Sequence, residues 1–157
     1  MELGAAVTVE ITATPEQVWA VVSDVTRIGE LSPETFEAEW LGGATGPALG
    51  ATFRGHVNRN GSGLKYWTTC RVVACDPGRS FAFDVHGPGG MVLNTWSYVI
   101  VPSAIGASVT ESFRLADSAG TRFYWRLTGS RRAKTNVRGM TQTLNRVKAI
   151  VEAASVV

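Results

Sequence analysis

Alternation of apolar and polar residues dominates the start of the chain. Val7, Val9 and Ile11 alternate with threonines and a glutamate, which is the period of two that a half-buried β-strand requires. The pattern predicts a strand over residues 5–12. One face of this strand should be buried and the other should be open to water.

A helix signal follows directly. In Thr14-Pro15-Glu16-Gln17 the threonine hydroxyl can accept from a free backbone amide of the first turn, and the glutamine completes a capping box. Proline at the first helical position loses no hydrogen bond. A short helix is predicted from here to about Ser23, and Asp24 can cap a second one that ends near Gly29.

Residues 35–115 have a different character. Short β-branched and aromatic runs are separated by Gly, Pro, Asn and Asp, and the connections are short enough to join antiparallel neighbours. Alternation places two sets of side chains toward the core, namely Phe36, Ala38 and Trp40, and Phe81, Phe83 and Val85. Six strands are predicted, at residues 35–41, 50–59, 65–76, 80–86, 91–102 and 108–115.

The helical period returns after Asp117, weakly over residues 121–128 and clearly over 131–153. At about 100° per residue, one apolar stripe forms within an arc of about 80°. Basic residues gather on the opposite side. The stripe consists of Val137, Met140, Leu144, Val147 and Val151, and the basic face of Arg131, Lys134 and Arg138.

The predicted order is one strand, two short helices, six strands and one long helix. A long amphipathic helix is the natural cover for one face of a curved antiparallel sheet, so the fold class is α+β. With 157 residues, 45% apolar and 18% charged, the chain fits one domain spanning residues 1–157.

Composition narrows the function classes. The net charge of +2 is too small to indicate a dedicated nucleic-acid or membrane-surface protein, and it favours a neutral partner. Residues 1–4 lack the basic and apolar regions of a signal peptide, and no apolar run approaches the roughly 20 residues that span a bilayer. A cytoplasmic protein is expected.

Cofactor and metal motifs are absent from the sequence. Cys70 and Cys75 fall in one predicted strand, roughly 16 Å apart, which is beyond the reach of a disulfide. A CxxC pair, a HExxH helix and a glycine-rich phosphate loop are all missing, and the two histidines cannot hold a metal without acidic or thiol ligands. No cofactor and no metal are expected.

Several motifs spread over almost the whole chain resemble one known superfamily. They are Val9-Glu10-Ile11-Thr12-Ala13-Thr14-Pro15-Glu16-Gln17-Val18-Trp19 with the following Asp24, Gly50-Ala51-Thr52-Phe53-Arg54-Gly55, Asp76-Pro77-Gly78-Arg79-Ser80-Phe81-Ala82-Phe83, Trp96-Ser97-Tyr98, Val109-Thr110-Glu111-Ser112-Phe113, and Gly139-Met140 with Thr143-Leu144. The chain thus resembles the polyketide cyclase/dehydrase-like branch of the START-like, or SRPBCC, superfamily. The resemblance implies a helix-grip fold, in which a seven-stranded sheet wraps around the carboxy-terminal helix and encloses a cavity for an apolar or amphipathic molecule. Most of these residues serve turns and packing, so activity has to be argued from the site.

Aromatic residues could line such a cavity. A curved sheet and a helix leave a gap unless bulky side chains fill it, and apolar clefts with few polar groups are the usual ligand sites. The same side chains could instead form an ordinary packed core. The candidate ligand-binding residues from the strands are Phe53, Trp67, Phe83, Trp96, Tyr98 and Phe113, with Met140 and Leu144 facing them from the helix.

Glu111 is the candidate catalytic residue. Alternation places it on the same face as Val109 and Phe113, where a buried carboxylate would need a partner. It could pair with an arginine, act as a general acid or base, or bind a ligand hydroxyl, and it could also lie in a structural ion pair or at a wet rim. Arg71 shares the side of Trp67 and is a candidate partner for Glu111 or for a ligand carboxylate.

Other polar residues carry weaker signals. The outer face is the expected place of His56, and His86 lies beside a glycine-rich loop. Asn94, Tyr66 and Tyr124 could donate hydrogen bonds to a carbonyl or phenol. Ser97 and Ser112 have no histidine nearby in the sequence, so a covalent mechanism is poorly supported.

One dense basic segment contains Arg126, Arg131, Arg132, Lys134 and Arg138, and Phe123-Tyr124-Trp125 precedes it. Cations beside aromatic rings can bind RNA or anionic lipid, although an ordinary solvent-exposed helix face would have the same sequence pattern.

Three hypotheses for the function follow. They are a module that binds a small hydrophobic molecule such as a lipid, polyketide or quinone, a cyclase or dehydratase with non-covalent acid/base catalysis, and a protein that uses the basic helix to bind RNA or a membrane. DNA is not an expected partner, and the oligomeric state is open.

Overall fold

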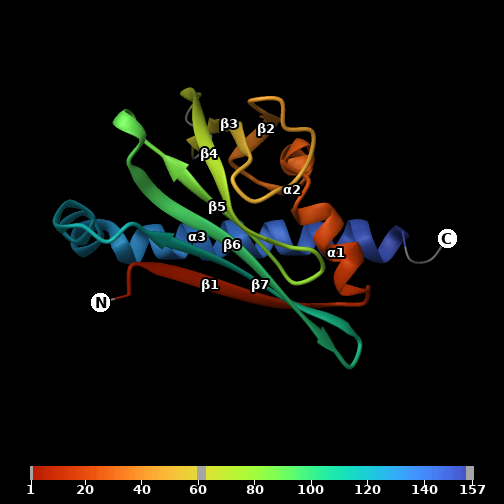
Figure 1. Ribbon diagram of the computed structural model, residues 1–157. Coiled ribbons are helices and arrows are strands. Elements are labelled where there is room, and N and C mark those ends of the chain that lie inside the picture. Colours follow the sequence, from red (N-terminus) through yellow and green to blue (C-terminus); the bar gives the residue numbers. More distant parts are fainter. Residues whose placement is uncertain (1, 60–62, 155–157) are drawn as a thin grey trace.

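The computed structural model describes residues 2–59 and 63–154. Seven antiparallel strands form one curved sheet in the order β1-β7-β6-β5-β4-β3-β2, which confirms the predicted α+β class with its helix-grip arrangement. One long helix lies across the sheet (Figure 1). The elements are β1 (Gly4–Ile11), α1 (Pro15–Val22), η1 (Val25–Arg27), α2 (Ile28–Leu31), β2 (Thr35–Trp40), β3 (Thr52–Asn58), β4 (Lys65–Asp76), β5 (Ser80–His86), η3 (Pro88–Gly90), β6 (Val92–Ser103), β7 (Gly106–Leu115) and α3 (Ala119–Ala154).

The two predicted helix caps are confirmed. The Thr14 hydroxyl accepts from the Gln17 amide, and the Gln17 side chain accepts from the Thr14 amide, so the capping box closes in both directions. The Asp24 carboxylate accepts from the Thr26 amide at the start of η1. These short helices lead the chain from β1 across to the far edge of the sheet, where β2 begins.

The core lies between the inner face of the sheet and the carboxy-terminal half of α3. Met140, Leu144, Val147 and Val151 of the predicted stripe are buried, whereas Val137 is 39% exposed. The helix makes its main contacts with β1, β7, α1 and α2. Trp125, in the amino-terminal half of the helix, is buried against Phe113 of β7 in a second, smaller core cluster.

The prediction for β2 was wrong in one respect. Phe36 was expected toward the core but is 41% exposed, because the pairing of β2 with β3 is irregular between Thr35 and Glu37. Ala38 and Trp40 do pack against the core, as expected. The second predicted set is confirmed, since Phe81, Phe83 and Val85 are all buried.

Candidate functional site

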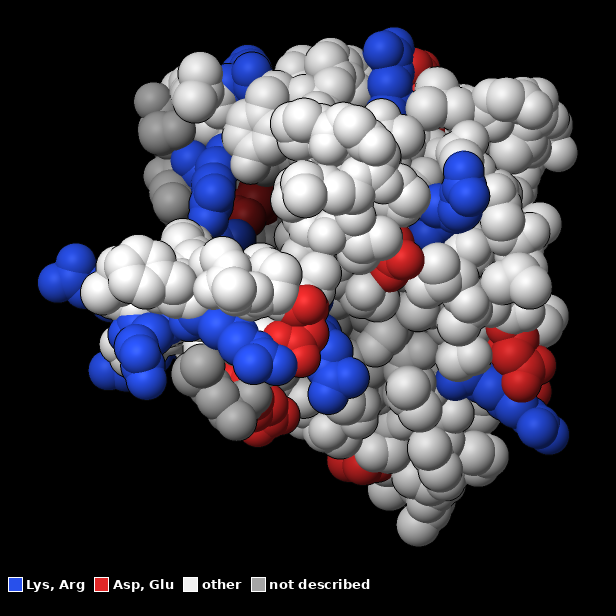
Figure 2. Space-filling view, turned by 60° about the vertical axis from the view of Figure 1, so that its left-hand side comes forward, with Lys and Arg blue, Asp and Glu red and all other residues white. Residues whose placement is uncertain are grey.

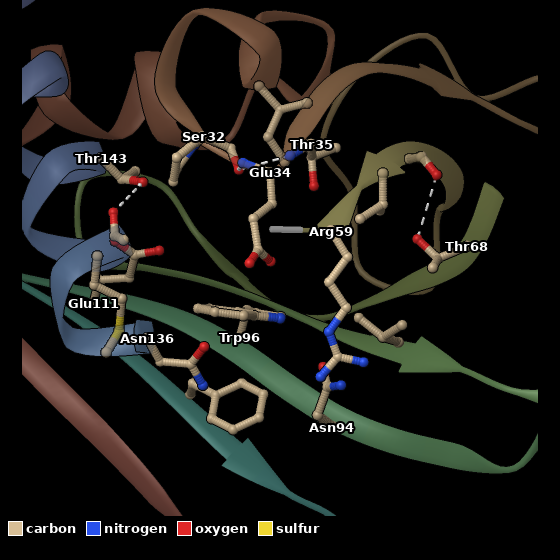
Figure 3. Close-up of a pocket in the computed structure, with 18 of the residues that line it drawn as sticks. Ser32, Glu34, Thr35, Arg59, Thr68, Asn94, Trp96, Glu111, Asn136 and Thr143 are labelled. Atoms are coloured by element: carbon tan, nitrogen blue, oxygen red, sulfur yellow. Dashed lines mark hydrogen bonds between the residues drawn. The ribbon is translucent and has the colours of Figure 1, made fainter. Parts of the chain in front are cut away.

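A cavity of about 520 Å³ lies between the inner face of the sheet and α3. This is within the range of about 300–1,000 Å³ that is usual for small-molecule sites. Its walls come from β3 to β7, from α3 and from the segment that joins α2 to β2. Figure 3 shows Glu111 and Asn136 at one end, Trp96 along the floor, and Arg59 with Asn94 at the other end.

Aromatic side chains form the floor. Trp96 pairs with Phe83 on one side and with Phe113 on the other, so the three residues stand in a row across β5, β6 and β7. Trp96 and Phe113 are in ring contact with centroids 4.8 Å apart. Phe53 and Met140 also line the cavity, from β3 and from α3. The inward orientation predicted for these residues is confirmed, and their binding role remains a prediction.

Two residues predicted to line the cavity lie on the outer face of the sheet instead. Trp67 is 43% exposed, and Arg71 is also exposed, so both lie on the outer face of β4. Thr68 and Cys70 line the cavity instead, because alternation along β4 turns the even-numbered side chains inward. The prediction that Trp67 and Arg71 share a face holds, but that face is the solvent side. Arg71 therefore cannot partner Glu111.

Trp67 belongs to a stack on the outer face. Its ring lies 4.2 Å from that of His56, nearly parallel, and the Arg54 guanidinium sits 4.2 Å from the Trp67 ring centre. His56 Nδ1 also lies 2.7 Å from a carboxylate oxygen of Glu37. His56 thus occupies the outer face, as predicted. Leu144 is fully buried, but it packs in the core and does not line the cavity.

Glu111 is the buried acid of the site, with an exposed fraction of only 4%. The Tyr98 hydroxyl donates to its Oε1 atom at 3.1 Å. Burial raises the pKa of Glu111 to about 8, against the smaller lowering effect of the tyrosine. The carboxyl is therefore largely protonated at neutral pH. The pKa of Tyr98 is also raised well above its usual value, first by burial and then by the neighbouring carboxyl.

Three buried polar atoms of the cavity wall have no hydrogen-bond partner within the described residues. They are Glu111 Oε2, Asn136 Nδ2 and Asn94 Oδ1. Buried polar groups are normally satisfied, and leaving one unsatisfied costs roughly 1–3 kcal/mol. Three of the four such atoms among the described residues lie around this one cavity. They are the positions at which a bound molecule would form hydrogen bonds.

The rim is more exposed and carries several arginines. Arg59 donates from Nη2 to the Tyr124 hydroxyl at 3.4 Å, which links the end of β3 to α3. An ion pair of 3.5 Å joins Arg132 to Glu34. Tyr66 and Arg138 lie on the same rim, where both are exposed. Tyr66, Asn94 and Tyr124, which were considered as hydrogen-bond donors, are thus all brought to this one cavity.

Sequence reasoning missed Asn136, Arg59 and Glu34. Asn136 had a usable signal, because it precedes Met140 by four residues and so interrupts the apolar face of α3. A polar residue at such a position is buried and needs a partner. Arg59 and Glu34 stand at the ends of elements, where neither alternation nor helical period indicates a direction.

Burial raises the pKa of the Cys70 thiol to about 12, so it is a poor nucleophile although it lines the cavity. Ser97 and Ser112 hydrogen-bond each other. Within residues 2–59 and 63–154, no cluster of three His, Cys, Asp or Glu side chains could hold a metal ion. No helix in this part of the chain is long and apolar enough to cross a membrane.

Comparison with known proteins gives the same picture as the geometry. A solution structure of a Polyketide_cyc-like protein from Corynebacterium glutamicum is 28% identical, with a TM-score of 0.65 over 98% of this chain and 94% of that one. An AHSA1-like protein from Aeromonas hydrophila (17% identity, TM-score 0.62, 97% and 94% covered) shares the fold. A Staphylococcus aureus protein of unknown function also shares the fold, with 9% sequence identity and a TM-score of 0.72 over 99% of this chain and 96% of that one. No curated protein matches the chain.

The comparison with family profiles covers almost the entire sequence. The family described as "Polyketide cyclase / dehydrase and lipid transport" matches residues 4–152. Together with the seven-stranded sheet and its long helix, this match identifies the fold as a ligand-binding one. The chain belongs to the polyketide cyclase/dehydrase and lipid transport family.

Proposed function

We propose that the protein binds a small, elongated, mostly apolar molecule with polar groups near both ends, such as a lipid, a polyketide or a quinone-like compound. The observation that carries the proposal is the set of unsatisfied polar atoms in a cavity whose floor is aromatic. An apolar body would cover the floor formed by Phe83, Trp96 and Phe113. Such burial contributes about 25 cal/mol per Å² of apolar surface.

The deep end favours a carbonyl or hydroxyl oxygen. With a pKa near 8, the Glu111 carboxyl is protonated at pH 7 and can donate a hydrogen bond, and the Asn136 amide nitrogen is a second donor. A ligand carbonyl could accept from such donors. A ligand carboxylate is disfavoured at this end, because the ionised group would be buried beside the acidic side chain of Glu111.

The other end favours a hydroxyl or amine. Asn94 Oδ1 is an acceptor, and Asn94 stands four residues from Tyr98 on the same face of β6. Four residues of strand span about 13 Å, so the two polar ends are separated by roughly the length of a ten-carbon chain. This spacing supports an elongated ligand over a compact one.

Native mass spectrometry before and after organic extraction tests the proposal. We expect an added mass retained by the folded chain and lost on extraction. Monomyristoylglycerol, a naphthoquinone and a flavonoid then serve as probes for three ligand classes. Asn136→Leu should weaken the best probe about tenfold, because it removes one hydrogen bond, whereas the control Asn145→Leu on the exposed side of α3 should not. A clean mass together with no binding of any probe would overturn the proposal.

A second candidate function is non-covalent catalysis as in a cyclase or dehydratase. Glu111 favours it, because a carboxyl with a pKa near 8 can both donate and accept a proton around neutral pH. The cavity would hold a flexible substrate in one conformation while Glu111 moves one proton. Glu111→Gln separates the two functions. It should leave probe binding within a few-fold while abolishing turnover, whereas unchanged turnover would exclude this role.

A further inference from the structure

Exposed apolar side chains are concentrated around the mouth of the cavity. Eight of the sixteen large exposed hydrophobic residues in the described part of the chain come from three segments there. These are the start of β4, the start of β6 with the residue before it, and the first turns of α3. They are Leu64 and Tyr66, Met91, Val92 and Leu93, and Phe123, Tyr124 and Leu127. Since isolated apolar residues are normal on a surface but a contiguous patch is not, this grouping indicates a contact surface.

The three segments lie side by side. Tyr66, Leu93 and Tyr124, one from each segment, all line the cavity. Hydrogen bonds tie neighbouring parts together, from Arg59 to the Tyr124 hydroxyl and from the Ala116 amide to the Leu93 carbonyl. In Figure 1 the β5–β6 connection and the start of α3 both lie at the left, away from the carboxy terminus.

The outward side of α3 continues this apolar patch with cations. At about 100° per residue, Phe123, Leu127, Arg131, Lys134 and Arg138 fall within an arc of about 80°. Between Asp117 and Glu152 the chain has eight Lys and Arg residues and no acidic residue. Figure 2 shows Lys and Arg side chains gathered at the left of this face with large uncharged side chains beside them. The overall charge of +2 conceals this local excess.

Most of the cations on this side are available to an external partner. Among the described residues, Arg122 is paired with Asp117 and Arg132 with Glu34. Arg126, Arg131 and Lys134 are exposed and have no carboxylate within ion-pair distance there. A cationic, apolar surface fits a partner that offers both negative charge and an apolar interior.

We propose that this surface docks on an anionic lipid bilayer and so presents the cavity mouth to the membrane. Phe123, Leu127 and Met91 would enter the interfacial region, while the arginines and Lys134 would contact lipid phosphates. RNA fits less well, because aliphatic tips such as Leu127 and Met91 have no stacking role on bases. Exchange of a ligand between membrane and cavity rests on the proposed function, whereas the docking itself does not.

Co-sedimentation with vesicles that contain no added ligand tests the docking. We expect the protein to bind vesicles with about 30% phosphatidylglycerol and to bind pure phosphatidylcholine at least about tenfold more weakly. Raising the salt concentration should weaken the binding further, because it screens exposed charges. Arg131→Gln with Lys134→Gln should reduce binding about 25-fold, at about fivefold per charge.

The apolar contribution needs its own pair of variants. Phe123→Ser with Leu127→Ser should reduce vesicle binding by about tenfold or more, because both side chains are well exposed in the free protein and would be buried in lipid. The matched control is Val99→Ser with Val101→Ser, which changes two exposed apolar residues on β6 at a distance from the patch. The control should bind as the wild type does. Unchanged denaturation midpoints would show that all variants fold.

The outcomes separate the two proposals. Loss of probe binding in Asn136→Leu with vesicle binding intact would support docking independently of the ligand. No binding to phosphatidylglycerol vesicles, with probe binding intact, would overturn the docking and leave the proposed function standing. A labelled oligouridine provides the RNA control. If it binds, competes with the vesicles and binds equally well to the Phe123→Ser/Leu127→Ser variant, the surface is an RNA site and the proposal is overturned as well.

Discussion

Both faces of the sheet carry polar residues among aromatic ones, but these polar groups are paired on the outer face and partly unsatisfied on the inner face. On the outer face, Arg54 is paired with Glu39, and His56 with Glu37, all in contact with water. On the inner face, Glu111 and Asn94 keep polar atoms that find no partner among the described residues. Because water solvates the outer pairs, each contributes little to stability and little is lost when one breaks. On the inner face water is excluded, so each polar atom without a hydrogen bond lowers the stability of the fold. Unsatisfied polar atoms retained on a buried face indicate a ligand site better than aromatic content does.

The largest difference between the faces should be in core packing. Phe53→Ala on the inner face should lower the free energy of unfolding by about 3–5 kcal/mol, because Phe53 is 1% exposed and packs edge-on against Phe83. Trp67→Ala on the outer face should cost about 1 kcal/mol, through the loss of its contacts with His56 and Arg54. Urea denaturation measures both. Equal losses would contradict the assignment of the faces.

The pH dependence of stability should come from the inner face. The pKa of Glu111 is about 8 in the folded protein against an ordinary value of 4.5. Between these values the folded state holds a proton that the unfolded state has released, so stability falls as pH rises, by about 1.4 kcal/mol per pH unit. Glu111→Gln should remove this slope, while Glu39→Gln on the outer face should keep it. Denaturation from pH 5 to 8 measures the slopes, and a slope unchanged by Glu111→Gln would refute the raised pKa.

Removing the Asn136 amide should raise the stability of the ligand-free protein and weaken ligand binding. Asn136→Leu replaces a buried amide nitrogen that has no partner in the described structure by an apolar group of similar size. The ligand-free protein should become more stable by about 1–3 kcal/mol, while probe binding weakens. Thermal denaturation with and without the probe measures both effects. Loss of stability without the probe would mean that Asn136 serves packing instead of binding.

The sequence predicted the fold more fully than it predicted the directions of side chains. Capping boxes, turn residues and alternation are local signals, and these placed the helices and strands within about two residues at most ends. Alternation also tells which side chains share a face, but it does not tell which face is inner. In β4 both faces carry large side chains, with Tyr66 beside Trp67 and Val72 beside Val73, so only the pairing with β3 and β5 decides the direction.

Glu111 could be placed because its strand is less ambiguous. In β7, Val109 and Phe113 flank it on one face, while Thr110 and Ser112 occupy the other. The Tyr98–Glu111 pair could not be found in the same way, because it depends on the register of β6 against β7. Cavity sites assembled across strands therefore need the register, which no local pattern supplies.

The smallest expected effect concerns the ion pair of the outer face. A double-mutant cycle on Arg54 and Glu39 should give a coupling energy of about 0.2–1 kcal/mol, since both side chains are about half exposed. Adding about 1 M NaCl should remove most of it, because the screening length then falls to about 3 Å. The matched cycle on Tyr98 and Glu111, measured below pH 7, should keep its coupling in the same salt, because the pair is buried and the acid is neutral. A Tyr98–Glu111 coupling that disappears in salt would mean that water and ions reach the deep end of the cavity, which would remove the physical basis for reading its unsatisfied atoms as a binding site.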